Sequence, residues 1–492
     1  MMKHQRIDNP GSFRPEPCRP PAAQSETVRT GAGTTADAII SRMAEERLPR
    51  YTSYPTAPAF GSGNGPEAWA ADHADWLAAL PIDRPVSLYL HVPYCRSMCR
   101  YCGCTTKITR RDDPIDAYAA VLQREIDLVA DRMPDAMKAG HIHWGGGTPG
   151  ILGTERMKAI RRRLADRFTL DPAAECAIEL DPRHMASVPP RDLAAMGVNR
   201  VSFGIQTLDA RVQAAIGRIQ PFEQVAAAVA SVRDVGIRRI SFDLIYGLPY
   251  QTVESAAQTV WTLLALSPDR ISIFGYAHIP WAKPHQRLIP DETLPDAHDR
   301  AAQFTAMADV LADAGYVAIG IDHFARPDDS MAIAHRDGTL RRNFQGYTTD
   351  PCDTILGFGA SAISTLRQGY TGNDTSIAAY SRSIHDGRLA TNRGYELTRE
   401  DRLRGDAINA LMCTSSVSID DVARRHPGLR DQIQRIFDDA ASSLEHLGNA
   451  GLVEWDGNRL SIAREARLLV RSVAAAFDEY LAKTGEKYSK AI

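Results

Sequence analysis

The chain has 492 residues, of which 44% are hydrophobic and 24% charged, so it is long enough to bury one large core or two ordinary ones. Its 57 Lys and Arg residues nearly balance its 60 Asp and Glu residues, and the net charge of -3 provides no general basic surface for nucleic acid or an anionic membrane. No apolar run approaches the ~20 residues that cross a bilayer, and the first residues contain no apolar signal-peptide core. We therefore expect a soluble, cytoplasmic protein without a membrane span.

The N-terminal residues 1–38 are rich in Pro, Gly, Thr and Ala and lack a sustained apolar periodicity. This composition predicts an extension that is mobile or only partly ordered. A transit peptide is an alternative, but Asp8, Glu16, Glu26 and several prolines suit an amphipathic Arg-rich helix poorly. We expect the next segment, 39–84, to cover the substrate.

Between residues 85 and 290, short β-branched or aromatic runs alternate with longer Ala-rich amphipathic segments, which is typical of strand–helix units around a parallel sheet. Six strands are predicted, at residues 87–92, 141–145, 177–181, 200–206, 239–247 and 270–276. Six units are too few for a closed eight-stranded barrel. The sequence therefore predicts an α/β fold, an incomplete (β/α)6 TIM-like barrel of parallel strands that is open at the side to a large substrate.

Polar residues follow these strands at their carboxyl ends, where the chemistry of parallel α/β folds gathers. We expect them to converge on one rim, and in chain order they are Cys95, Gly146, Gly147, Thr148, Glu179, Asp181, Gln206, Asp243, Tyr276, Ala277 and His278.

The pattern changes after about residue 290. Residues 291–390 contain helices and a loop-rich stretch, which we interpret as a barrel extension with substrate and cofactor loops, and residues 391–492 form a mostly helical C-terminal domain. Asp456-Gly457 between two apolar runs predicts a β-hairpin in that domain. Helices followed by a hairpin could form a winged helix, but the basic residues here alternate with acids and form no stripe for DNA. We expect a substrate-covering domain and no nucleic-acid partner.

Four of the eight cysteines lie within ten residues, at 95, 99, 102 and 104. Such clustering is typical of a metal or redox site in a reducing compartment rather than of a disulfide framework. A structural zinc site usually needs a second pair of ligands at a distance, and a thioredoxin-like C-x-x-C would leave Cys95 unexplained. Three thiolates spaced by three and two residues instead suit three irons of a [4Fe-4S] cluster, whose fourth iron stays free to bind a substrate or cofactor.

The spacing C-x-x-x-C-x-aromatic-C resembles the signature of radical S-adenosylmethionine enzymes, a match that is specific only to that superfamily. Longer tracts resemble the oxygen-independent coproporphyrinogen III oxidase family, and they keep their order from about residue 50 to the C-terminus. These tracts are YTSYPTAP, SLYLHVPYCRSMCRYCGC, HWGGGTP, IELDPR, FDLIYGLP, YAHIP, DHFARPDD and RNFQGYTT.

The resemblance implies that Cys95, Cys99 and Cys102 bind the cluster and that its open iron chelates the amino and carboxylate groups of S-adenosylmethionine. Cys104 would be a non-ligand that handles substrate or hydrogen transfer, or it could simply pack under the loop. Contacts to one or two bound S-adenosylmethionine molecules are implied for Tyr89, Tyr101, Gly146, Gly147, Thr148, Glu179, Gln206, Arg218, Asp243, Ala277 and Ile363.

Several of these residues have simpler interpretations from the sequence alone. A tight strand-to-loop turn is the simpler interpretation of the glycines at 145 to 147, and a solvated surface residue is the simpler interpretation of Arg218. Asp243 lies in an otherwise apolar strand, where an unpartnered carboxylate would be costly, and this favours a ligand role.

The family reaction takes a hydrogen from the β-carbon of a propionate with a 5′-deoxyadenosyl radical; carbon dioxide then leaves, one electron passes to an acceptor, and a vinyl group remains. Two such reactions turn coproporphyrinogen III into protoporphyrinogen IX during haem biosynthesis. The resemblance also implies a one-electron donor similar to flavodoxin or ferredoxin, an electron acceptor, and a monomer.

A substrate with four propionates needs local cations in a nearly neutral chain. The first candidates flank the cysteines, at Arg96, Arg100, Lys107, Arg110 and Arg111, and the second candidates are Arg326, Arg341 and Arg342.

Two alternative functions share part of this pattern. A related haem chaperone would bind and transfer haem, but Cys104 and the YTSYPTAP and NFQGYTT tracts favour the oxidase. A radical enzyme that opens the haem ring would differ in the mass of its product.

Overall fold

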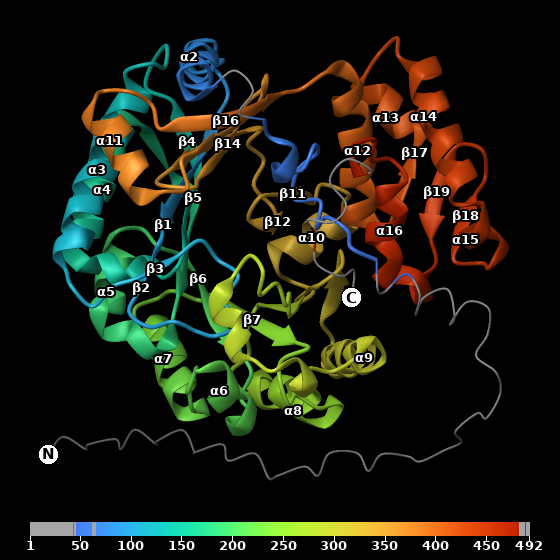
Figure 1. Cartoon of the computed structure of the whole chain (residues 1–492), viewed down its shortest axis with the longest axis horizontal. Coiled ribbons are helices and arrows are strands. Elements are labelled where there is room, and N and C mark those ends of the chain that lie inside the picture. The colour runs from blue at the N-terminus through green and yellow to red at the C-terminus, as the bar shows by residue number, and fades with distance from the viewer. Residues whose placement is uncertain (1–42, 44–45, 62–64, 482–487, 489–492) are drawn as a thin grey trace, which may run out of the picture.

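The computed structural model describes residues 43, 46–61, 65–481 and 488, and Figure 1 shows the whole chain. The predicted N-terminal extension, 1–38, lies outside the described residues. The centre of the molecule is a 12-stranded sheet with the order β16-β15-β14-β13-β1-β4-β5-β6-β7-β8-β10-β9. Its two edge strands, β16 and β9, do not pair with each other, so the sheet is not a closed barrel.

The six predicted strands form the middle of this sheet in chain order and pair in parallel, which confirms the predicted strand–helix units. They are β1 (Val86–Val92), β4 (Lys138–Gly146), β5 (Thr169–Leu180), β6 (Arg200–Gln206), β7 (Arg239–Tyr246) and β8 (Arg270–Gly275). Their apolar residues belong to one large hydrophobic core, as expected for strands with both faces covered.

Helices follow the strands and form the outer layer of the barrel (Figure 1). They are α3 (Asp113–Ala130), α4 (Gly153–Arg167), α5 (Pro190–Ala195), α6 (Ala210–Ile216), α7 (Phe222–Asp234), α8 (Val253–Leu264) and α9 (Ala297–Asp313). This arrangement leaves the carboxyl ends of the strands free for loops.

The region after residue 313 adds strands that the sequence analysis does not predict. β13 (Thr354–Phe358) pairs in parallel with β1, and the antiparallel strands β14 (Ile363–Thr365), β15 (Gly369–Asn373) and β16 (Thr391–Glu396) extend that edge. β9 (Val317–Ile319) and β10 (His323–Ala325) extend the other edge beyond β8. These strands are short and several contain glycine, so their alternation is too weak to recognise in the sequence. Between them lie β11 (Arg341–Asn343), β12 (Gly346–Thr348), α10 (Ser330–Arg336) and α11 (Ile377–His385).

The C-terminal part is mostly helical and has its own hydrophobic core. It contains α12 (Arg399–Thr414), α13 (Ile419–Arg425), α14 (Arg430–Ser443), α15 (Glu445–Asn449), α16 (Val470–Ala475) and a small sheet of β17 (Ser416–Ser418), β18 (Val453–Trp455) and β19 (Arg459–Ile462). The predicted hairpin at Asp456-Gly457 is confirmed, because β18 and β19 pair antiparallel across it.

The segment before the barrel connects the two cores. Tyr51 and Tyr54 are buried in the C-terminal core, whereas α2 (Gly65–Ala78) packs against β16 of the large sheet. No helix among the described residues is long and apolar enough to span a membrane.

Candidate active site

The four clustered cysteines lie on a loop that leaves the carboxyl end of β1. The short parallel strands β2 (Tyr94–Cys95) and β3 (Lys107–Ile108) close its base, with the Lys107 amide donating to the Pro93 carbonyl at 2.8 Å. We call residues 95–106 the cluster loop. Its position at this end of the sheet is the one that parallel α/β folds reserve for chemistry.

A segment after β8 holds the cluster loop by its backbone. His285 donates from Nε2 to the Cys102 carbonyl at 2.7 Å, Gln286 donates to the Tyr101 carbonyl at 2.9 Å, and Lys283 donates to the Cys104 carbonyl at 3.0 Å. Because backbone atoms accept these bonds, the thiols remain free for other partners.

Two arginines donate to the sulfur of Cys99. Arg183 Nη2 and Arg218 Nη1 each lie 3.6 Å from it, and Asp181 accepts from the same two guanidinium groups at 2.7 and 3.0 Å. Burial alone would raise the pKa of Asp181, but the bond from Arg183 and the charge of Arg218 outweigh it and lower that pKa to about 2. This carboxylate therefore stays ionised and keeps both cations beside the sulfur.

The other thiols have different surroundings. Burial raises the pKa of Cys95 to about 11, and its sulfur lies 3.6 Å from the Thr148 hydroxyl. A hydrogen bond from the Cys104 thiol lowers the pKa of Cys102 below that of an ordinary thiol. The geometry therefore makes Cys104 a hydrogen-bond donor to a neighbouring thiolate.

The space around the thiols fits an iron–sulfur cube. At Gly147, an added Cβ would lie 2.6 Å from the Tyr94 carbonyl oxygen and 2.9 Å from the Cys95 sulfur, so only glycine leaves this wall clear. Among the described residues, no three His, Cys, Asp or Glu side chains converge as the ligands of a single ion do. A cube places each thiolate on a different iron, so its three thiolates need not meet at one point as the ligands of a mononuclear zinc ion must.

The cluster loop faces a cavity of about 380 Å³ at the carboxyl ends of the strands. Thirteen of the fifteen residues implied by the resemblance line it, and they are Cys95, Cys99, Tyr101, Cys102, Cys104, Gly146, Gly147, Thr148, Glu179, Gln206, Arg218, Asp243 and Ala277. These residues come from the ends of six different strands and the loops that follow them. Of the eleven residues predicted to converge on one rim, ten line this cavity, whereas His278 does not and lies 3.0 Å from Asp291 instead.

Tyr89 and Ile363 do not line the cavity. The Tyr89 hydroxyl lies 2.9 Å from His91 Nδ1, and its ring lies beside Gly145, behind the wall that Glu179 forms. Ile363 begins β14 and pairs with Gly372. The cofactor contacts implied for these two residues therefore stay a prediction.

Two carboxylates of the cavity have different environments. Asp243 accepts from the Ser202 hydroxyl at 2.9 Å, and burial raises its pKa to about 6. Glu179 lies 3.0 Å from His143 Nε2 and accepts from the Gly146 amide at 3.3 Å. Burying the ionised carboxylate of Asp243 in the apolar strand therefore costs folding free energy, as its sequence position predicts.

Several wall residues escape the sequence analysis. Arg50 donates to the Gly275 carbonyl at 3.1 Å and lies over the Phe274 ring. Arg50 directly precedes the tract YTSYPTAP, and its position next to this tract is the sequence feature that could have identified it as a site residue. Arg183 lies within the tract IELDPR, but its donation to Cys99 depends on a turn after β5 that the sequence does not reveal.

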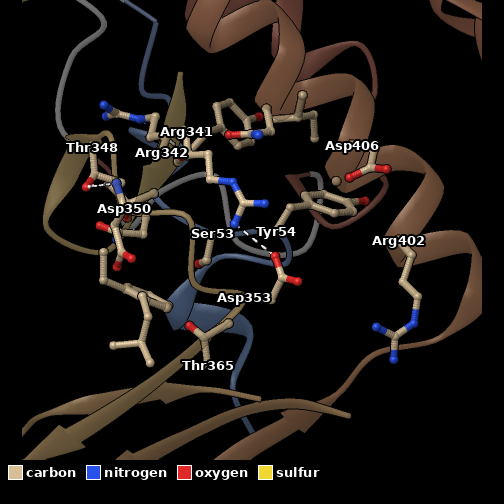
Figure 2. Close-up of a pocket in the computed structure, with 18 of the residues that line it drawn as sticks. Ser53, Tyr54, Arg341, Arg342, Thr348, Asp350, Asp353, Thr365, Arg402 and Asp406 are labelled. Carbon is tan, nitrogen blue, oxygen red and sulfur yellow. Dashed lines mark hydrogen bonds and ion pairs between the residues drawn. The ribbon is translucent and has the colours of Figure 1, made fainter. Parts of the chain in front are cut away.

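A larger cavity of about 640 Å³ lies between β11 and α12 (Figure 2). Its charged wall residues are four arginines and four aspartates, namely Arg341, Arg342, Arg402, Arg425, Asp350, Asp353, Asp401 and Asp406. Arg341 pairs with Asp353 at 2.8 Å, and His426 lies 2.9 Å from Asp406. Because these charges balance and no thiol but the buried Cys352 lines this space, the smaller cavity remains the candidate active site.

Comparisons with known proteins agree with this location. Residues 89–260 match the Radical SAM superfamily model. The chain is 51% identical over 457 residues to the oxygen-independent coproporphyrinogen III oxidase of Bradyrhizobium diazoefficiens, covering 93% of this chain and 100% of that relative. It is 38% identical over 463 residues to the Pseudomonas aeruginosa protein of the same name, covering 93% of this chain and 98% of that relative.

A solved structure described as coproporphyrinogen III oxidase (HemN) from Escherichia coli, a Radical SAM enzyme, is also similar. It shares 35% identity at a TM-score of 0.81, covering 89% of this chain and 100% of that one. The similarity thus extends over both the barrel and the C-terminal part. The chain belongs to the oxygen-independent coproporphyrinogen III oxidase family of the Radical SAM superfamily.

Proposed function

We propose that this chain converts two propionate side chains of coproporphyrinogen III into vinyl groups without oxygen, giving protoporphyrinogen IX. The observation that carries this proposal is the match along nearly the whole chain to oxidases of this name, combined with a three-thiol loop facing a cavity. The match includes the C-terminal part, so it extends well beyond the cluster-binding core that many radical enzymes share.

A [4Fe-4S] cluster and S-adenosylmethionine, when bound, supply the one-electron reduction and the hydrogen-abstracting radical of this chemistry. The residues that we propose as cluster ligands are Cys95, Cys99 and Cys102. Arg183 and Arg218 would donate to the ligand sulfur of Cys99, which stabilises added negative charge on the cluster.

The cavity walls suit the charged ends of S-adenosylmethionine. Glu179 and Asp243 provide carboxylates for its ammonium and hydroxyl groups, and the glycines at 146 and 147 let backbone approach it closely. Gln206 has a left-handed backbone (φ 70°) at the end of β6, a strained conformation of the kind that gathers at binding sites. We propose contacts with a first and a second cofactor molecule along this wall.

The cavity also receives cations suited to a propionate. Of the five arginines and lysines first considered near the cysteines, only Arg96 lines it, and Arg50 joins from the segment before the barrel. Arg110 and Arg111 point into solvent, and Arg326 is exposed beside Asp328. We therefore propose Arg50 and Arg96 as the propionate partners, Arg96 in exchange for its ion pair with Asp112 at 2.5 Å, with the walls excluding water from the radical chemistry.

We further propose that the chain acts as a cytoplasmic monomer. It would receive electrons from a carrier similar to flavodoxin or ferredoxin and pass one electron per propionate to an acceptor. The near-neutral charge of the chain supports neither nucleic acid nor membrane as a partner.

The test is an anaerobic assay of reconstituted protein with S-adenosylmethionine, a one-electron reductant, coproporphyrinogen III and cell extract as a source of acceptor. We expect protoporphyrinogen IX by mass, together with 5′-deoxyadenosine. Cleavage of S-adenosylmethionine without decarboxylation, in a protein that binds haem tightly, would instead establish the haem-chaperone function.

A further inference from the structure

Exposed apolar side chains gather on the outer surface beside the cluster loop. Eight large hydrophobic side chains are exposed among the described residues, and three of them, Ile219, Tyr250 and Leu288, lie on segments packed around Tyr101 of that loop. Ile219 and Leu288 are 59% and 63% exposed. A gathering of this kind on a protein surface usually marks an interaction site.

Hydrogen bonds and a cation–ring contact join α6 to the cluster loop and to the turn at 248–250. The Arg100 amide donates to the Ile216 carbonyl at 2.9 Å, and the Arg100 guanidinium donates to the Ala215 carbonyl at 3.1 Å. Arg211 lies 4.3 Å over the Tyr250 ring. The α6 helix, the turn at 248–250 and residues 286–289 thereby form one face next to the cluster loop.

Cations on this face are not neutralised. Arg100, Arg211 and Arg287 are exposed, and within the described ranges none of them makes an ion pair. The nearby acids are Asp209, which caps α6 and accepts from the Val212 amide at 2.9 Å, Asp291, which lies 3.0 Å from His278 Nε2, and Glu292. Three exposed arginines without an acidic partner among the described residues therefore lie on this face, in a chain whose net charge is -3.

This face is also the short route to the cluster site. Arg100 directly follows Cys99, and Ile219 directly follows Arg218, whose guanidinium donates to the Cys99 sulfur. Adjacent Cα atoms are ~3.8 Å apart, so a protein seated here lies only a few residues from a proposed ligand.

We propose that Arg100, Arg211, Ile219, Tyr250, Arg287 and Leu288, the donor face, dock a small acidic one-electron carrier protein. The carrier is oxidised by one electron, and the cluster is reduced by that electron. Acidic side chains of the carrier meet the arginines, and an apolar patch around its redox group covers Ile219 and Leu288. This inference rests on the proposed cluster site, and it adds where and by what charge the reducing partner binds.

The test compares two reductants of the reconstituted holoenzyme, an acidic bacterial flavodoxin and dithionite. Cluster reduction is followed by stopped-flow absorbance, and the affinity for oxidised flavodoxin by calorimetry. In the variant Arg211→Glu/Arg287→Glu we expect reduction by flavodoxin to slow at least tenfold at low salt and the Kd to rise by a similar factor. Reduction by dithionite, which needs no docking, should be unchanged.

Leu288→Ser alone should weaken flavodoxin binding severalfold without changing its salt dependence. This variant tests the donor face if the charge-reversed protein fails to fold. The matched control is Ile82→Ser/Arg238→Glu, which alters an exposed apolar residue and an exposed arginine at the opposite end of the strands. That end is about 20 Å away, the length of a seven-residue strand.

Unchanged flavodoxin rates in both donor-face variants would overturn the docking proposal, and so would an equal loss with both reductants. If flavodoxin reduces the native cluster and the variants slow it, but no propionate is decarboxylated, the donor face holds and the proposed reaction fails.

Discussion

At the amino-terminal end of the parallel sheet, buried charges face one another, whereas at the carboxyl end they face a cavity. Arg270 donates to Asp329 at 2.7 Å, and Arg200 lies 3.0 Å from Glu175. Burial alone would raise the pKa of Glu175, but bonds and charge from His141 and Arg200 hold it well below its usual range. These charges have partners within the fold, so their role is structural.

The carboxyl end of the sheet also buries ionisable side chains, but among the described residues two of them lack ion-pair partners. Burial raises the pKa of Asp243 to about 6 and that of Cys95 to about 11, because neither group makes an ion pair with any described residue and the weaker interactions, such as the Ser202 hydroxyl on Asp243 and the Thr148 hydroxyl on Cys95, do not offset the burial. Buried groups without a charge partner destabilise a fold unless a ligand completes them. The comparison teaches that the chemical use of a buried charge depends on whether the fold already supplies its partner.

The largest effect should come from the thiols. Cys99→Ser should reduce product formation at least about a thousandfold, because the cluster would lose one of three proposed ligands and the two arginines would face a hydroxyl. Iron and sulfide content and the visible absorption of the reconstituted protein measure the loss.

Cys352→Ala is the matched control, since Cys352 is a buried thiol far along the chain from the cluster loop. Full iron content in Cys99→Ser, or loss of iron in the control, would contradict the assignment of ligands.

The second largest effect should come from removing one partner of the buried ion pairs at the amino-terminal end of the sheet. Asp329→Asn would leave Arg270 buried without its carboxylate, and breaking a buried pair in this way costs about 3–5 kcal/mol. We expect the free energy of unfolding in urea to fall by this amount while the folded protein keeps its iron content and its KM. A shift below 1 kcal/mol would mean that this network is not structural.

The third effect has the opposite sign. The pKa of Asp243 is about 6 in the folded chain against 3.8 for an ordinary aspartate, so the folded state holds a proton between about pH 4 and 6, and stability falls as pH rises through this window. Asp243→Asn keeps an acceptor for Ser202 and removes the ionisation. At pH 7.5 the variant should be more stable by roughly 1–3 kcal/mol, and this gain should disappear near pH 4.

Urea unfolding at both pH values measures that gain, and calorimetry should show weaker binding of S-adenosylmethionine. The exposed Asp234→Asn should change neither quantity. If Asp243→Asn were less stable than the native protein, Asp243 would have a structural role, as the paired charges at the amino-terminal end of the sheet do.

The sequence predicts the six central strands and most of the cavity because strong local signals mark them. β-branched strands alternate with amphipathic helices, and polar residues such as Glu179 and Gln206 stand where strands end. The edge strands β13 to β16 escape prediction because they are short and several contain glycine, and β13 in addition pairs with β1, a partner more than 200 residues away. Arg50 is missed for a similar reason, since it reaches Gly275 across 225 residues.

The smallest effect compares a cation inside the cavity, Arg50, with one that the sequence analysis places near the cysteines, Arg111. Arg50 lines the cavity, whereas the Arg111 side chain is 77% exposed and pairs only with Asp113. Losing one charge-assisted bond costs about 1.5 kcal/mol, so Arg50→Gln should raise the KM for coproporphyrinogen III about tenfold with little change in kcat. Arg111→Gln should stay within about twofold of the native value, and Arg50→Lys should recover part of the loss. Equal effects at both arginines would mean that a diffuse positive field, rather than a contact inside the cavity, attracts the substrate, since only a field acts independently of where each side chain points.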